Sequence, residues 1–104
     1  MTKVALVAKM TAAPGKRDEL VEAFGSLYDT VATEEGTEIY ALHLDSGDAD
    51  VVWFYELYRD MEALTTHGTS EAMQAMGPQL ASLLAGRPEL TVLTPVRAKG
   101  LSFD

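Results

Sequence analysis

The sequence contains no cysteine, and this absence excludes disulfide bonds, thiolate catalysis and metal sites built on cysteine ligands. Basic residues are also scarce: 8 Lys and Arg stand against 16 Asp and Glu, which gives a formal net charge of -8. A chain with this charge is repelled by phosphate backbones and by anionic membrane surfaces. We therefore expect neither nucleic acid nor a membrane among its partners.

Long hydrophobic runs and glycine-rich ligand-binding motifs are missing as well. The apolar run near the N-terminus is far too short to cross a bilayer, and Lys9 follows it too soon for a typical signal sequence. No dinucleotide fingerprint or phosphate loop occurs, and the 2 histidines lack the carboxylate pattern of an iron site. We predict a cytoplasmic protein that uses no cofactor and no metal.

The residues that are present are typical of a globular protein. The chain has 104 residues, of which 47% are apolar and 23% are charged, and this length fits one small core. We predict a single domain over residues 1–104, with a core over about 3–96 and a C-terminal tail over 97–104.

The first half of the chain predicts a strand, a helix and a hairpin. The Val-rich segment 3–10 is followed by Pro14 and Gly15, which are typical of a turn. A helix over about 16–32 follows, because its apolar residues recur on one helical face. Segments 37–44 and 51–58 are joined by the short loop "DSGDAD", so they are expected to pair as an antiparallel hairpin.

The last third predicts two helical pieces and a strand. Asp60 can cap a short helix through Thr66, and Thr69 or Ser70 can cap the next one. Pro78 lies within the apolar pattern of that second piece, which indicates a kink or a new helix start. The segment 89–96 is a fourth strand.

The resulting order, β-α-β-β-α-β, is that of a ferredoxin-like α+β fold, with a four-stranded antiparallel sheet and its helices on one face. The second and third strands are apolar or aromatic on both sides, although the chain offers no cover for the second face. We therefore expect a second copy of the chain to bury that face in a homodimer.

Four features carry a resemblance: the element order, "PGKRDEL" before the first helix, "YALH" and "FYELYRDMEALTTHGTS". Together they resemble the antibiotic biosynthesis monooxygenase domain family, of the dimeric α+β barrel type, from about Lys3 to Val96. Its most specific residues are Glu56, Tyr58, Asp60, Ala63, Leu64, His67 and Ser70. The resemblance implies a homodimer with sheets packed face to face, and a pocket between the sheet and the helices of each subunit. Characterised members are mostly small monooxygenases that oxidise phenolic or quinol-like aromatics with O2 and no bound cofactor.

The alternation of side chains along a strand divides the aromatic residues of segment 51–58 between the two faces of the sheet. Phe54, Glu56 and Tyr58 share one face, and Trp53 and Tyr55 share the other. In the family the aromatic residue that ends this strand faces the pocket, and Tyr58 holds that position. The resemblance therefore places the first set in the pocket and the second set in the dimer interface.

The resemblance makes His67 the candidate catalytic base, with Tyr58 and Glu56 as orienting groups. His67 follows Leu64 by three residues, so both side chains should look toward the sheet. A plainer interpretation stands beside this one: a histidine near a helix end is more often a hydrogen-bonded or capping histidine than a catalytic base, and Glu56 could simply form an ion pair or hydrogen bond that ties the sheet to a helix.

The remaining candidates are substrate-binding residues: Phe54, Leu64, Met73 and His43. Phe54 and Tyr58 can also be explained as plain core residues, and the apolar stripe that contains Met73 is best explained as core, although methionine also gives a pocket an adaptable wall. His43 is either a second pocket group or an exposed strand residue.

The expected activity is oxidation of a phenolic or quinol-like small molecule by O2, with the substrate itself as the electron source. Loss of a hydroxyl proton gives an anion that can reduce O2, and the protein supplies orientation, desolvation and a proton acceptor. Two alternatives use the same pocket: non-catalytic binding of an aromatic metabolite, and cofactor-free isomerisation of a small carbonyl compound. Haem degradation, which related members of the family carry out, is less favoured. The pattern of that branch has a pocket asparagine on the first strand and a haem-ligating histidine farther along the second helix, and neither residue is present in "KVALVAKM" or "EAMQAM".

Overall fold

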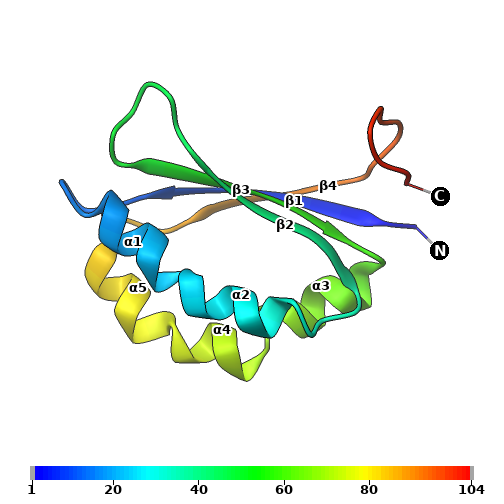
Figure 1. The fold of residues 1–104 in the computed structure, drawn as a ribbon, viewed down its shortest axis with the longest axis horizontal. Helices are drawn as coiled ribbons and strands as arrows, with labels where there is room; N and C mark the ends of the chain where they lie inside the picture. Colours follow the sequence, from blue (N-terminus) through cyan, green and yellow to red (C-terminus); the bar gives the residue numbers. More distant parts are fainter. Residues whose placement is uncertain (1, 104) are drawn as a thin grey trace.

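The computed structural model describes residues 2–103, which form one antiparallel sheet with helices against one of its faces (Figure 1). The strands are β1 (Val4–Thr11), β2 (Thr37–Leu44), β3 (Val51–Tyr58) and β4 (Glu89–Leu93), in the spatial order β2-β3-β1-β4. The helices are α1 (Arg17–Ala23), α2 (Gly25–Val31), α3 (Met61–Gly68), α4 (Glu71–Ala75) and α5 (Gly77–Leu83). The predicted ferredoxin-like topology is confirmed. No helix within residues 2–103 has the length and apolar character needed to cross a membrane.

Two of the predicted element boundaries need correction, and one of the two alternatives predicted for the last helical piece is confirmed. The single helix expected over 16–32 is two helices, which meet at Phe24 and Gly25, where glycine has a poor helix propensity. The last helical piece is also divided, and Pro78 lies in the first turn of α5, as one of the two predicted alternatives required. The fourth strand ends at Leu93 instead of continuing to Val96, because Pro95 cannot donate a ladder hydrogen bond.

The core lies between the sheet and the helices. In β3, Val52, Phe54 and Tyr58 are at most 1% exposed, and they face the helices. Phe24, at the junction of α1 and α2, packs edge-on against Phe54 with ring centroids 4.8 Å apart. The aromatic strand is thus the central wall of the core.

The opposite face of the sheet has no helix, but it is not uniformly open. Tyr55 and Trp53 are partly exposed there, whereas Ala5 and Leu57 are buried. The segment after β4 turns back over this side of the sheet (Figure 1), and Lys3 Nζ donates to the carbonyl oxygen of Ser102 at 3.3 Å. The C-terminal segment therefore covers one end of the face and leaves the part around Tyr55 available.

Candidate functional site

The candidate site is built around His67, which lies in the last turn of α3 and is only 4% exposed. Asp60 begins this helix by accepting a hydrogen bond from the Ala63 N–H at 2.8 Å, as its sequence position predicted. Ala63 and His67 are four residues apart, so both lie on the buried face of α3. The helix cap therefore fixes where the imidazole enters the core.

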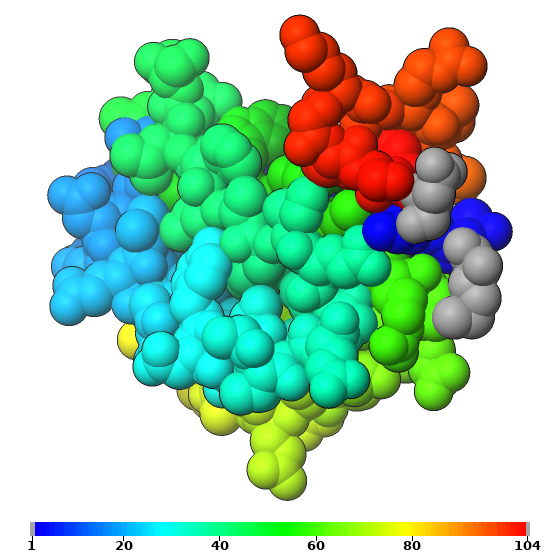
Figure 2. Space-filling view, turned by 45° about the vertical axis from the view of Figure 1, so that its right-hand side comes forward, coloured from blue at the N-terminus to red at the C-terminus, as the bar shows by residue number. Residues whose placement is uncertain are grey.

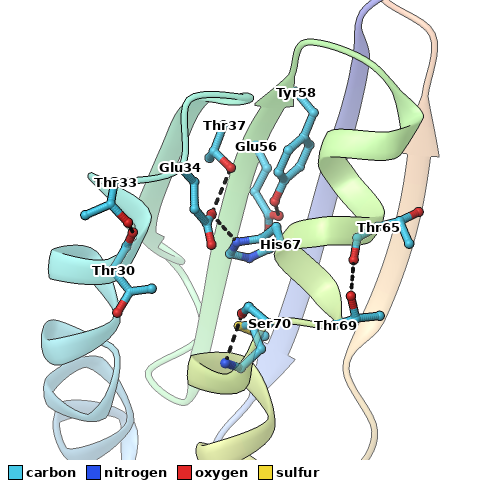
Figure 3. Close-up of polar contacts among 11 residues, drawn as sticks. Thr30, Thr33, Glu34, Thr37, Glu56, Tyr58, Thr65, His67, Thr69 and Ser70 are labelled. Carbon is cyan, nitrogen blue, oxygen red and sulfur yellow. Dashed lines mark hydrogen bonds and ion pairs between the residues drawn. The ribbon is translucent and has the colours of Figure 1, made fainter.

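A carboxylate from the turn between α2 and β2 holds the imidazole. His67 Nδ1 lies 2.8 Å from Glu34 Oε1, and Thr37 Oγ1 donates to the same oxygen at 2.9 Å (Figure 3). An ionised carboxylate can only accept hydrogen bonds, so with Glu34 ionised the hydrogen of a neutral His67 ring must lie on Nδ1. The other ring nitrogen, Nε2, then carries a lone pair that can accept a proton.

The Nε2 atom is not fully buried. It has no hydrogen-bond partner within residues 2–103. Every fully buried side-chain nitrogen or oxygen in that part of the chain does have a partner, so Nε2 cannot be one of them. His67 also lines a cleft of about 340 Å³ between the 33–37 turn and α3. Figure 2 shows this turn, in teal, beside the green residues of α3. His67 is thus the buried histidine that a small ligand in this cleft would contact.

Two tyrosine rings pack around the imidazole. The ring centroids of Tyr40 and Tyr58 lie 5.0 Å and 5.6 Å from that of His67. Tyr40 also packs against Phe54, with centroids 4.9 Å apart. Burial raises the pKa of both tyrosines, so their hydroxyl groups stay protonated at neutral pH.

A buried pair, Glu56 and Tyr58, lies on the other side of His67 from Glu34 (Figure 3). The Tyr58 hydroxyl donates to Glu56 Oε1. Burial raises the pKa of the Glu56 carboxyl above its ordinary value of 4.5, whereas the hydrogen bond from Tyr58 and the nearby charge of His67 act in the opposite direction. The imidazole therefore lies between two carboxyl groups, and a positive charge on it would be stabilised.

The raised pKa of Glu56 predicts how stability varies with pH. The folded state binds this proton more tightly than the unfolded chain, so the contribution of Glu56 is most favourable below the ordinary carboxyl pKa and is lost as pH rises through the folded pKa. In Glu56→Gln, the glutamine side chain cannot ionise, but its amide oxygen can still accept the hydrogen bond from the Tyr58 hydroxyl. Urea unfolding from acid to neutral pH should show the variant gaining stability relative to the wild type as pH rises. A difference that is constant across this range would contradict the prediction.

The sequence candidates are brought together only in part. Phe54, Glu56 and Tyr58 share the helix-side face, but they are buried and do not line the cleft beside His67. Leu64 packs near Tyr58, and Met73 packs against the larger core cluster that contains Phe54.

His43 lies apart from this group. It is exposed and pairs with Trp53 in the β2–β3 register, which places it on the opposite face of the sheet. Of the two histidines, only His67 lies among the other candidates.

Sequence reasoning missed three members of the site: Glu34, Thr37 and Tyr40. Glu34 lies 33 residues before His67 in a polar stretch that is typical of a turn, so no local spacing connects them. Tyr40 could have been found from strand register, because it pairs with Glu56 and therefore shares its face.

The approach of the 33–37 turn to α3 depends on Gly36. A Cβ atom added to Gly36 would lie 2.5 Å from the Cβ of Ala63 and 3.6 Å from its Cα. The Gly36 carbonyl oxygen also accepts a hydrogen bond from the Arg59 N–H at 2.8 Å, which fixes the turn against the end of β3. Glycine thus allows Glu34 to reach His67.

We predict that Gly36→Ala lowers the free energy of unfolding by about 1–3 kcal/mol, the usual cost of overpacking. Urea unfolding measures this change. The matched double variant Gly36→Ala/Ala63→Gly removes the clashing methyl group and should recover part of the loss, after allowance for the helix cost of Ala63→Gly alone. Strictly additive effects of the two substitutions would show that this contact does not limit the approach.

Comparison with known proteins places this architecture in a family. A model of the family described as antibiotic biosynthesis monooxygenase matches residues 3–79. A solved structure of a presumed antibiotic biosynthesis monooxygenase from Caulobacter crescentus CB15 is 30% identical, with a TM-score of 0.86 over 92% of each chain. The protein PA3566 from Pseudomonas aeruginosa is 28% identical, with a TM-score of 0.84 over 93% of this chain and 97% of that one. Rv0793 from Mycobacterium tuberculosis is 27% identical, with a TM-score of 0.83 over 93% and 98%. No protein of curated function matches the chain.

Proposed function

Because this chain belongs to the antibiotic biosynthesis monooxygenase family, we propose that it is a cofactor-independent monooxygenase that oxidises a phenolic or quinol-like aromatic small molecule with O2. The observation that carries the proposal is the buried imidazole of His67, which lines the cleft and which Glu34 holds through Nδ1, so that Nε2 is free of hydrogen bonds to the described residues. A fixed imidazole with one free nitrogen is suited to accept a proton from a bound hydroxyl group.

The proposed reaction begins with proton transfer from the substrate hydroxyl group to His67 Nε2. The resulting anion is electron-rich enough to reduce O2 directly. For a hydroquinone, one oxygen atom forms a new bond to ring carbon and the other leaves as water, while the four electrons come from the substrate, which becomes a hydroxyquinone. The atoms balance without an added reductant, so the protein needs to supply only a base and the orientation of the substrate.

The groups around His67 support this role. The imidazolium that forms lies between Glu34 and Glu56, so its charge is stabilised on both sides. The rings of Tyr40 and Tyr58 pack around the imidazole, and their protonated hydroxyl groups do not compete for the proton. Glu34 is thus a positioning residue, whereas His67 is the group that exchanges the proton.

The proposed working unit is a homodimer formed through the uncovered sheet face. Tyr55 and Trp53 are partly exposed at its centre, on the strand whose other face forms the core wall. Sheet faces that carry aromatic side chains are rarely left in water. The dimer would bury this surface without altering the His67 site on the other side of the sheet.

Oxygen uptake tests the proposal. The purified protein, assayed with chelator present, is incubated with a panel of hydroquinones and anthrone-like phenols, and uptake is compared with the same mixtures without protein. We expect accelerated uptake for at least one compound, and with labelled oxygen gas one labelled atom in the product. Binding without accelerated uptake would favour a binding protein. Turnover that persists without oxygen would identify an isomerase.

A further inference from the structure

The rim of the cleft beside His67 carries an excess of negative charge. Glu35 and Glu62 are exposed on opposite sides of it, one on the 33–37 turn and one in the first turn of α3. Neither forms an ion pair with any residue in the range 2–103. The one cation on the lining, Arg59, lies 3.6 Å from the Asp60 carboxylate, measured from Nε to Oδ2. The local charge of the rim is therefore negative.

The same cleft is lined by His67, which carries a ring nitrogen without a hydrogen bond to any described residue. His67 is 96% buried, since only 4% of it is exposed, and it lines the cleft. Its Nδ1 is held by Glu34, and its Nε2 has no hydrogen-bond partner among the described residues. A ligand that reaches His67 through this cleft therefore passes or contacts the carboxylates of the rim.

We propose that this cleft selects phenolic substrates that are neutral or carry an ammonium group, and that it disfavours substrates with a carboxylate or phosphate. The inference rests on the proposed function, because it assigns the charge class of the same substrate. The overall charge of -8 acts in the same direction, since it repels anions from the whole surface. An ammonium group near Glu35 or Glu62 would find a carboxylate that forms no ion pair with any residue in the range 2–103, whereas Arg59 on the same lining is already paired with Asp60.

The expected size of the effect follows from Coulomb's law. A unit charge about 4 Å from a carboxylate interacts with it by about 1 kcal/mol in water, which is roughly a fivefold effect on binding, and the sign reverses between an ammonium and a carboxylate. Salt reduces such exposed interactions within a Debye length of about 10 Å at 0.1 M. We therefore expect at least a tenfold preference for the ammonium form at low ionic strength and a smaller one at high ionic strength.

The test uses three hydroquinones of similar size, with aminoethyl, hydroxyethyl and carboxymethyl side chains. The value of kcat/KM for oxygen uptake is measured for each, after subtraction of the uptake without protein. The wild type should favour the amine over the carboxylate. Glu35→Gln/Glu62→Gln should bring that ratio down by roughly tenfold, and the comparison between variants cancels the intrinsic reactivity of the compounds. Glu71→Gln is the matched control, because Glu71 also lies in the first turn of a capped helix but not on the cleft.

The outcomes separate the inference from the proposed function. Turnover of the neutral compound with no preference between the two charged ones would overturn the inference and leave the monooxygenase intact. If none of the three compounds is oxidised, the proposed function fails for hydroquinones of this kind. The inference is then tested by comparing the binding affinities of the charged compounds. In that case the imidazole resonances of His67 are followed by NMR under nitrogen, and the amine should bind more tightly than the carboxylate. Equal or reversed affinities would overturn it.

Discussion

His67→Ala should lower kcat for oxygen uptake by roughly 10²–10⁴-fold, the range that a positioned general base contributes. The reason is geometric: Nε2 is the ring atom left free when Glu34 holds Nδ1, and the side chain lines the cleft. The measurement is oxygen uptake at saturating substrate. Retention of wild-type kcat in a folded His67→Ala protein would remove His67 from the chemistry.

A matched control separates loss of the base from loss of structure. His67→Gln fills much of the same space and can donate a hydrogen bond to Glu34, but its amide cannot act as a base. We expect it to fold more stably than His67→Ala and to be equally inactive. Activity in His67→Gln with inactivity in His67→Ala would show that the residue is structural.

Tyr55→Glu should weaken association of the proposed homodimer by several kcal/mol, because it would place an unpaired charge in the proposed apolar interface. Tyr55 is a better test than Trp53. The Trp53 indole N–H donates to Asp45 Oδ1 at 2.7 Å, and Lys9 Nζ lies 5.6 Å from the centroid of the Trp53 ring. Substituting Trp53 would therefore also remove contacts within its own chain.

Sedimentation velocity over a range of concentrations measures this effect. Ala81→Glu is the control, since Ala81 is exposed on α5 on the other side of the sheet and receives the same charge. It should leave association unchanged. A wild-type protein that is already monomeric at micromolar concentration would contradict the proposed interface.

Strand parity and helix caps made much of the fold predictable from sequence. Alternation along β3 placed Phe54, Glu56 and Tyr58 on one face, and their burial follows from that face being covered by helices. The cap at Asp60 fixed the phase of α3 and hence the inward direction of His67. These features depend on neighbours within a few residues, which the sequence displays directly.

The rest depends on contacts between distant segments. Glu34 reaches His67 only because Gly36 allows the turn to approach Ala63, and no spacing rule links these residues. The predicted aromatic pocket is a filled core at Phe54, and the cleft is polar and lies at the edge of the helix layer. Whether side chains fill a space or leave it open depends on packing in three dimensions, which periodicity does not determine.

The identity of the proton acceptor is tested most directly by the dependence of turnover on pH in the wild type, Glu56→Gln and His67→Ala. Turnover should fall in acid, because an imidazolium cannot accept a proton. Glu56 favours that charged form through its nearby carboxylate, so Glu56→Gln should move the acid limb to lower pH while the protein stays folded. The His67→Ala variant should lose the limb together with most of its activity. The same acid limb in an active His67→Ala protein would contradict the account, because the ionisation would then belong to the substrate or to another group.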